Sequence, residues 1–197
     1  MSGQGIALAP RTDETILLAA HQLLVEGGFA GMSMRCLSHR AGLQAGSLYH
    51  HFSGKQEVLE EVLGSIVQRR VGGWRRVRPV ARPAWQRLQQ FIDFHVRHVL
   101  QHAADQAVLR SERRYLDAEA RQRLEQLERE YFQVLFASVA EGVAAGVFSV
   151  TCAGLAARTL RGLLDSIEDT PDDDGRMTPW MIEVAARVLR VGIHSNS

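Results

Sequence analysis

The residues from Ser33 to Lys55 have the types and spacing of a DNA-binding helix-turn-helix. Ser33 precedes a helical run that Gly42 interrupts, and a second short helix is expected from Gln44 to His50. In such motifs the second helix enters the major groove, while the first crosses the DNA backbone. The turn between the helices requires a positive φ, which glycine adopts without steric cost. The chemistry indicated is hydrogen bonding to bases and phosphates.

Helical periodicity surrounds this motif along the whole chain, and no strand-like alternation or internal repeat is present. Apolar residues recur at the spacing of one helix face, and acids, prolines and glycines stand at the expected helix ends. The fold class expected is therefore all-α, with about nine helices. They are expected at about 13–26, 34–40, 45–50, 55–70, 83–102, 105–116, 118–145, 152–167 and 179–193.

A composition break, GGWRRVRPVARP, covers residues 72–83. Its two glycines and two prolines make it a poor helix, so the fourth helix is expected to end at about Arg70. We therefore predict a flexible arm at 1–12, a small helix-turn-helix domain at 13–71 and a larger helical domain at 72–197. The arginines of the break suit either a solvated linker, paired with the Glu-rich helices, or a basic flank that touches DNA backbone or an acidic ligand.

Composition restricts the class of protein further. Apolar residues make up 46% of the chain and the formal net charge is +1, so DNA binding must rest on local charge. No apolar run is long enough to span a membrane, and the N-terminus does not resemble a secretory signal. Cys36 and Cys152 are expected to be reduced thiols without metal-ligand spacing. We expect a cytoplasmic protein that contacts no membrane.

The segment LLAAHQLLVEGGFAGMSMRCLSHRAGLQAGSLYHHFSGKQEVLEEVL resembles the amino-terminal domain of the TetR family of bacterial transcriptional regulators. The matching elements occur in order: an apolar helix ending in Gly-Gly-Phe, a Ser-capped helix, an Ala-Gly-Leu turn, a Ser-Leu-Tyr-His-His-Phe segment and a Gly-Lys before another apolar helix. The resemblance implies a ligand-responsive one-component regulator without a cofactor. Such a protein acts as a repressor that binds a near-palindromic double-stranded operator as a homodimer and is released by a small effector.

The resemblance also assigns expected roles to the residues of the motif. The start of the second helix faces a phosphate, Gln44 can offer a bidentate amide to adenine, and Lys55, the only lysine of the chain, stands at a phosphate-contacting position. Gln44 departs from the Ser or Thr that often caps this helix, so its cap is expected to be weaker. The residues expected to contact DNA are Ser33, Arg35, Gln44, Ala45, Ser47, Tyr49, His50 and Lys55.

The larger domain is implied by the resemblance to dimerise and to bind the effector. Its last two helices are expected to form the dimer interface through Leu155, Leu160, Leu163, Leu164, Trp180, Val184 and Val188, some of which also belong to the intrachain core. The effector pocket is expected among Phe91, Phe94, His95, His98, Glu112, Arg113, Tyr115, Tyr131, Phe132 and Phe136. The stretch VLRSERRYLDAEARQRLEQLEREY resembles family members that respond to acyl-CoA, so a largely apolar, acyl-CoA-like effector is one candidate.

Three alternatives stay open. His95, His98 and His102 share one helix face and are either solvated or core histidines, polar anchors in a pocket, or ligands of a transition metal, although no Cys or carboxylate joins them. The protein can be an interaction protein that keeps the fold without effector control. It can also be an activator rather than a repressor. An enzyme is not expected, because the chain has no Glu-x-x-His pair and no Gly-rich phosphate loop.

Overall fold

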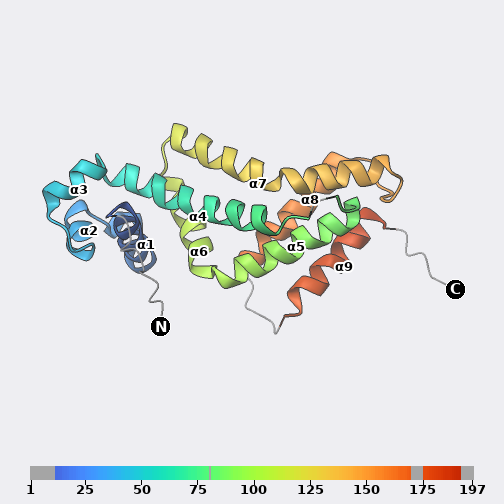
Figure 1. Cartoon of the computed structure of the whole chain (residues 1–197), viewed down its shortest axis with the longest axis horizontal. Helices are drawn as coiled ribbons and strands as arrows, with labels where there is room; N and C mark the ends of the chain where they lie inside the picture. The colour runs from blue at the N-terminus through green and yellow to red at the C-terminus, as the bar shows by residue number, and fades with distance from the viewer. Residues whose placement is uncertain (1–11, 80, 170–174, 192–197) are drawn as a thin grey trace, which may run out of the picture. The chain divides into compact units, whose positions relative to one another are not determined.

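The computed structural model describes residues 12–79, 81–169 and 175–191. All regular structure in these ranges is helical, which confirms the all-α prediction (Figure 1). The α-helices are α1 (Thr12–Gly31), α2 (Met34–Arg40), α3 (Ala45–His51), α4 (Lys55–Val77), α5 (Ala84–Gln101), α6 (Ala103–Glu112), α7 (Ala118–Ala144), α8 (Ala153–Asp165) and α9 (Met177–Leu189). Two short 3-10 helices, η1 (Arg113–Tyr115) and η2 (Ser166–Asp169), follow α6 and α8. No helix in the described ranges is long and apolar enough to cross a bilayer.

The described residues form two compact units. The smaller unit comprises residues 12–65 together with Val108–Arg121, and the larger comprises Ile66–Ala107 together with 122–169 and 175–191. The division falls inside α4, α6 and α7, so each of these helices contributes residues to both units.

The smaller unit has a core built from the inward faces of its helices. α1 packs on α2, and α2 packs on α3. Phe29 is buried against the ring of Tyr115, with 5.2 Å between the ring centroids. The other large apolar side chains buried here are Ile16, Leu24, Met32, Leu37, Leu48, Phe52, Val58, Leu59, Val62, Leu63, Val108, Leu109 and Leu116.

The first helix is longer than the sequence predicted. It was expected to end at Glu26, before two glycines, but α1 continues to Gly31 past a change of direction at Gly28. Gly28 has φ +64°, a conformation that costs glycine little, and the chain then resumes helical geometry. The Phe29 N–H is bonded to the Glu112 carboxylate at 2.9 Å, so the break in the helical hydrogen bonding is compensated from elsewhere in the same unit.

The prediction that the fourth helix ends near Arg70 is wrong, because α4 runs through both glycines to Val77. Trp74 supplies the reason: its side chain is buried, and its ring lies 5.2 Å from that of Phe91 and 5.6 Å from that of Phe94. This burial outweighs the helix penalty of about 1 kcal/mol per glycine. Gly73 also permits the packing, since a Cβ there would lie 2.9 Å from the Phe94 ring.

The larger unit is a helical bundle in which α5 packs against α8 and α9. An aromatic cluster of Trp74, Phe91, Tyr131 and Phe132 lies in its interior, with ring centroids 5.0–6.0 Å apart between neighbours. α9 begins two residues earlier and ends four residues earlier than predicted, because Arg190 takes a left-handed conformation with φ +49°. The acidic run at 172–174 lies outside the described residues.

Candidate nucleic-acid interface and ligand grooves

The α2–turn–α3 segment has the local geometry of a helix-turn-helix. The Ser33 hydroxyl caps α2 by accepting from the Cys36 N–H at 3.1 Å, as its position predicted. Gly42 has φ +68°, as the turn requires, and the Leu43 N–H then donates to the Ser38 carbonyl at 2.9 Å. The turn therefore has a defined conformation that fixes where α3 begins.

The two faces of α3 are sharply different. Leu48 is fully buried, whereas Tyr49 is 57% exposed, and the polar residues beside it are exposed too. Gln44 is the N-cap residue of α3, but its side-chain amide forms no capping hydrogen bond with the helix. The exposed residues on or before α3 that were expected to contact DNA are Gln44, Ala45, Ser47, Tyr49 and His50.

One ion pair and one histidine–carboxylate contact join α1 to the helix-turn-helix. Arg40, at the end of α2, forms a bidentate pair with Glu26 at 2.6 and 2.8 Å. The Arg40 hydrogen bond lowers the pKa of the Glu26 carboxyl. At the end of α3, His51 Nδ1 lies 2.6 Å from an Asp13 carboxylate oxygen. Sequence reasoning missed these pairs because their members are far apart in the chain, and only the helix arrangement brings them together.

The start of α4 is held by Ser53 and Glu57. The Ser53 N–H and hydroxyl both donate to Glu57 Oε2, at 2.7 and 2.8 Å, and the N–H bond is the main cause that lowers the pKa of Glu57. This arrangement resembles a capping box. Lys55 follows Ser53; its Nζ donates to the Phe29 carbonyl at 3.4 Å and lies 4.4 Å from the Phe29 ring centroid. The lysine therefore also packs onto the core of its own unit.

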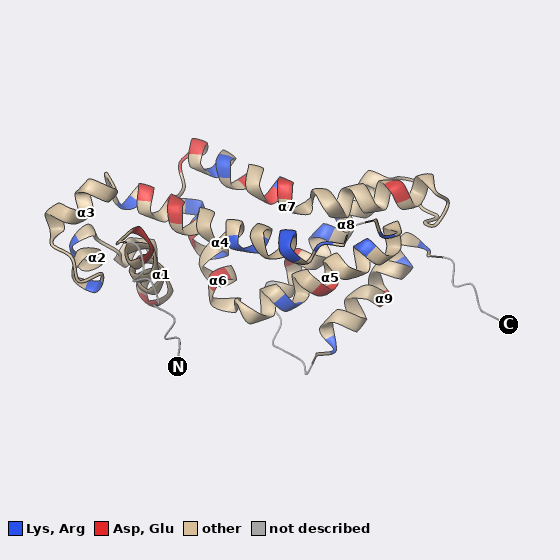
Figure 2. Ribbon diagram, viewed as in Figure 1, with Lys and Arg blue, Asp and Glu red and all other residues tan. Residues whose placement is uncertain are grey.

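Charge near α3 comes from its neighbours. α3 itself contains no Lys, Arg, Asp or Glu and is wholly tan in Figure 2, while Arg35 on α2 and Lys55 at the start of α4 flank it. Neutral groups suit reading of base edges, and flanking cations suit phosphate contacts. The arrangement can thus place both kinds of contact on one surface of the smaller unit.

The residues expected to line an effector pocket are divided between the two units. Glu112, Arg113 and Tyr115 belong to the smaller unit, where the Glu112 carboxylate accepts a hydrogen bond from the Phe29 N–H. In the larger unit, Phe91 is fully buried in the aromatic cluster, and Phe94 is half-buried against Trp74.

Two open grooves flank α7 in the larger unit. The first, of about 760 Å³, runs between α7 and α8, and it contains the expected pocket residues Phe132 and Phe136. Its remaining lining residues are Gln126, Arg129, Glu130, Gln133, Arg158, Arg161, Gly162 and Asp165. Aromatic rings beside three arginines can accommodate an apolar ligand with an anionic part.

The second groove, of about 710 Å³, lies between α4 and α7 and contains the expected pocket residue Tyr131. Val71 and Trp74 contribute its apolar wall, and Arg75 and Arg78 add positive charge. Sequence reasoning missed this site because it treated the segment from Gly72 as a linker rather than as helix.

The histidine face of α5 points into the core and toward other rings. His95 is fully buried, with Nδ1 3.0 Å from the Tyr131 hydroxyl, and His98 stacks on Phe94 with 5.5 Å between ring centroids. Burial is the main cause that lowers the pKa of both, to about 4 for His98. His102 instead lies 4.0 Å from Asp105. In the part of the chain that the structure describes, no three His, Cys, Asp or Glu side chains gather as a metal site requires.

The candidate dimer residues on α8 and α9 differ in exposure. Leu155 and Trp180 are more than half exposed, at 57% and 53%. Leu160 and Leu164 are buried in the intrachain core, while the half-buried members of the set are Leu163, Val184 and Val188. Large apolar side chains exposed on both helices are a feature of interaction surfaces.

Two protein-family patterns match the chain. Residues 16–62 match the bacterial regulatory proteins of the tetR family, and residues 81–192 match the tetracyclin repressor-like C-terminal domain. Among curated relatives, the HTH-type transcriptional repressor KstR2 of Mycolicibacterium smegmatis is 35% identical over 69 residues, which are 35% of this chain and 33% of that protein. The chain thus matches about a third of the length of this relative.

Solved structures extend the likeness over nearly the whole chain. A tetR-family regulatory protein from Rhodococcus RHA1 has a TM-score of 0.83 at 18% identity, over 93% of this chain and 100% of that one. AibR, solved in complex with isovaleryl coenzyme A and operator DNA, has a TM-score of 0.76 at 18% identity, over 92% of this chain and 100% of that one. At these identities the likeness shows the fold alone.

Proposed function

Because this chain belongs to the TetR family of bacterial regulatory proteins, we propose that it is a one-component transcriptional repressor. In this proposal a homodimer binds a near-palindromic operator, and a small, largely apolar effector releases it. The observation that carries the proposal is α3, which buries Leu48 and exposes Tyr49 behind a Gly42 turn of the required geometry. Release requires that the effector bind the DNA-free conformation more tightly than the DNA-bound one.

The proposed operator contacts combine reading and anchoring. Gln44, Ser47, Tyr49 and His50 offer neutral hydrogen-bonding groups to bases or phosphates, and the capped N-terminus of α2 faces a phosphate. The cationic side chains of Lys55 and Arg35 add salt-dependent affinity for the DNA backbone.

A selection experiment tests the operator. The purified chain is mixed with random genomic fragments, and the bound fragments are sequenced. Enrichment of one near-palindrome supports a specific dimeric regulator, whereas no enrichment, with or without added effector candidates, contradicts it. Expression of a reporter placed behind the enriched sequence separates repression from activation.

A substitution on α3 tests the surface assignment. Tyr49→Ala is expected to weaken binding to the selected operator by roughly tenfold or more, since it removes a hydrogen-bonding group and an aromatic contact. Tyr49→Phe is the matched variant, because it removes the hydroxyl alone. Circular dichroism and sedimentation are expected to show unchanged helix content and dimerisation. Unchanged operator affinity in Tyr49→Ala contradicts the role of α3.

The homodimer is proposed to form through α8 and α9. Leu155 and Trp180 expose apolar surface on these two helices, and a twofold arrangement of the chain would match a palindromic operator. Leu155→Asp is expected to give monomers in sedimentation equilibrium, because it places a charge in an apolar interface. Leu18→Asp, on the exposed surface of α1, is the control.

An acyl-CoA-like ligand is the effector class that the α7–α8 groove supports. Phe132 and Phe136 offer apolar surface beside Arg129, Arg158 and Arg161, which suit phosphates. AibR, which has the same fold, was solved with an acyl-CoA. In gel-shift titrations with octanoyl-CoA, succinyl-CoA and glutaryl-CoA, at least one acyl-CoA is expected to release the selected operator, and Arg158→Ala is expected to need more of it. Release by coenzyme A alone, or no release by any acyl-CoA, contradicts this effector class.

A further inference from the structure

Arg70 of α4 is a buried cation that forms no ion pair within the described residues. Its side chain belongs to the larger unit and is only 3% exposed. Within the described residues no carboxylate lies at ion-pair distance; its one hydrogen bond, from Nη1 to Gln106 Oε1, is long at 3.4 Å. The guanidinium also lies 4.8 Å from the Tyr131 ring centroid. Burying an uncompensated charge costs several kcal/mol in an ordinary core, so the arrangement calls for an explanation.

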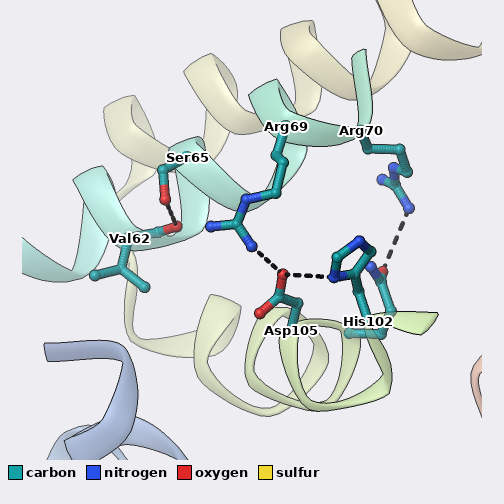
Figure 3. Close-up of polar contacts among 7 residues, drawn as sticks. Val62, Ser65, Arg69, Arg70, His102 and Asp105 are labelled. Atoms are coloured by element: carbon teal, nitrogen blue, oxygen red, sulfur yellow. Dashed lines mark hydrogen bonds and ion pairs between the residues drawn. The ribbon is translucent and has the colours of Figure 1, made fainter. Parts of the chain in front are cut away.

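The neighbouring Arg69, unlike Arg70, forms an ion pair. Arg69, one residue earlier on α4, pairs with Asp105 of α6 at 2.5 Å, and Asp105 also faces His102 (Figure 3). The Asp165 carboxylate of α8 attracts Arg70 electrostatically but forms no ion pair with it, because its ion pair, at 3.5 Å, is with Arg161. Acidic groups near the core are thus used by other cations.

Donors without partners surround Arg70. Arg70 Nε and Gln106 Nε2 are both buried without a hydrogen-bond partner. Tyr131 joins the set, since its ring faces Arg70 and its hydroxyl contacts His95. Four helices, α4, α5, α6 and α7, therefore bring a fixed positive charge and amide donors together. Buried polar groups of native proteins are almost always bonded, so a missing acceptor is indicated.

We propose that Arg70 and Gln106 bind a carboxylate of the effector, whose apolar body lies against the aromatic cluster of the larger unit. A carboxylate supplies the negative charge and the two acceptor oxygens that a guanidinium binds best. The groove between α4 and α7 lies beside this site, because it is lined by Tyr131, whose ring faces Arg70, and by Val71 and Trp74, which follow Arg70 on α4. The carboxylate belongs either to a free organic acid or to an acyl group that ends in an acid.

This inference rests on the proposed function only in assuming that the ligand is the effector. Binding is measured on the full chain without DNA, by calorimetric titration with hexanoate, octanoate and decanoate and with the primary alcohol of each length. Acids are expected to bind roughly tenfold or more tightly than the matched alcohols, since a hydrogen bond to a charged group is lost in the alcohol. Equal binding of acid and alcohol overturns the proposal, as does an absence of acid binding.

Two variants locate the site. Arg70→Met removes the charge at similar volume and is expected to weaken acid binding roughly tenfold while leaving alcohol binding unchanged. Arg76→Met, on the exposed face of the same helix, is the matched control and is expected to bind acids as the parent does. Gln106→Leu, expected to weaken acid binding roughly threefold, serves if Arg70→Met does not fold. Undiminished acid binding in Arg70→Met, or in Gln106→Leu in its place, overturns the assignment.

The source of the carboxylate and the proposed function are tested separately. Octanoyl-CoA has no free carboxylate on its acyl chain, whereas a succinyl or glutaryl thioester has one. Binding of these dicarboxylyl thioesters that is lost in Arg70→Met supports the acid-ended acyl group. Binding of octanoyl-CoA alone, unchanged in Arg70→Met, overturns the inference and leaves a repressor that responds to acyl-CoA. Acid binding by a chain that selects no operator sustains the carboxylate site and contradicts the proposed function.

Discussion

The smaller unit exposes the side chains selected from its sequence motif, whereas the larger unit buries many of those selected for a pocket. Tyr49 is 57% exposed on α3, while Phe91, His95 and Tyr131 are almost wholly buried. The difference reflects how each site is encoded. A helix-turn-helix is a local motif, so spacing alone separates its inward and outward faces. A pocket depends on which helices pack together, and helix periodicity cannot distinguish a core ring from a ligand-binding one.

The largest expected effect comes from replacing one aromatic residue of each unit by alanine. Phe91→Ala is expected to lower the free energy of unfolding by about 3–5 kcal/mol, because it leaves a cavity in the aromatic cluster. Tyr49→Ala is expected to change it by less than about 0.5 kcal/mol, since the side chain is mostly in water. Urea denaturation gives both values. A small cost for Phe91→Ala would contradict its place in the core.

Glu112 offers a second comparison. The sequence predicted it to line the effector pocket, but in the smaller unit its carboxylate accepts a hydrogen bond from the Phe29 N–H. Glu112→Ala leaves the buried Phe29 N–H without its acceptor, so it is expected to cost about 1–3 kcal/mol of unfolding free energy. Glu61→Ala, on the exposed face of α4, is the matched control. Effector affinity is expected to stay unchanged in both, and a large loss of affinity in Glu112→Ala alone would place Glu112 at the ligand after all.

Gly42 tests whether the turn is set by backbone conformation rather than by packing. No atom lies within 4 Å of a Cβ built at Gly42, so Gly42→Ala would meet only the strain of its positive φ, about 1–2 kcal/mol. Gly46→Ala, inside α3 and equally free of close atoms, is expected to stabilise the helix by about 0.5–1 kcal/mol. Thermal unfolding of both variants gives the sign of each change in stability. Changes of the same sign would contradict the turn geometry.

The smallest effect is a pH dependence that arises in the larger unit. Burial, with help from His102 and Arg70, lowers the pKa of His98 to about 4. An unfolded histidine titrates near 6.5, so the unfolded chain takes up the proton first, and the free energy of unfolding falls as the pH drops from about 6.5 to about 4. His98→Gln is expected to show a shallower fall over this window. His39→Gln, on the exposed side of α2, is the control, and identical slopes for the two variants would contradict the effect.

Local signals made much of the fold predictable. The Ser33 cap, the Gly42 turn and the bounds of α2 agree with expectation because each depends on residues close in sequence. Glycine content alone predicts too early an end for α4. The helix continues because Trp74 packs against Phe91 on α5, a contact that the sequence pattern does not reveal. The interhelix pairs Arg40–Glu26 and His51–Asp13 carry no sequence signal at all.

The candidate ligand site was predictable in part. Phe132 and Phe136 do line a groove, but the sequence places Arg70 at the end of a helix and gives no signal for Gln106. Arg70 is distinguished by its burial without an ion pair within the described residues, and this depends on how its neighbours pack. Burial of a charge is a property of packing rather than of residue type.

The continuity of α4, α6 and α7 across the division between the units has a consequence for cooperativity. A unit that unfolded alone would have to stop three helices in mid-run and leave their new ends uncapped. Helix breaks of this kind are unfavourable, so local melting in one unit should spread into the other. We therefore expect calorimetry to show one unfolding transition with equal calorimetric and van't Hoff enthalpies, as a single cooperative folding unit requires.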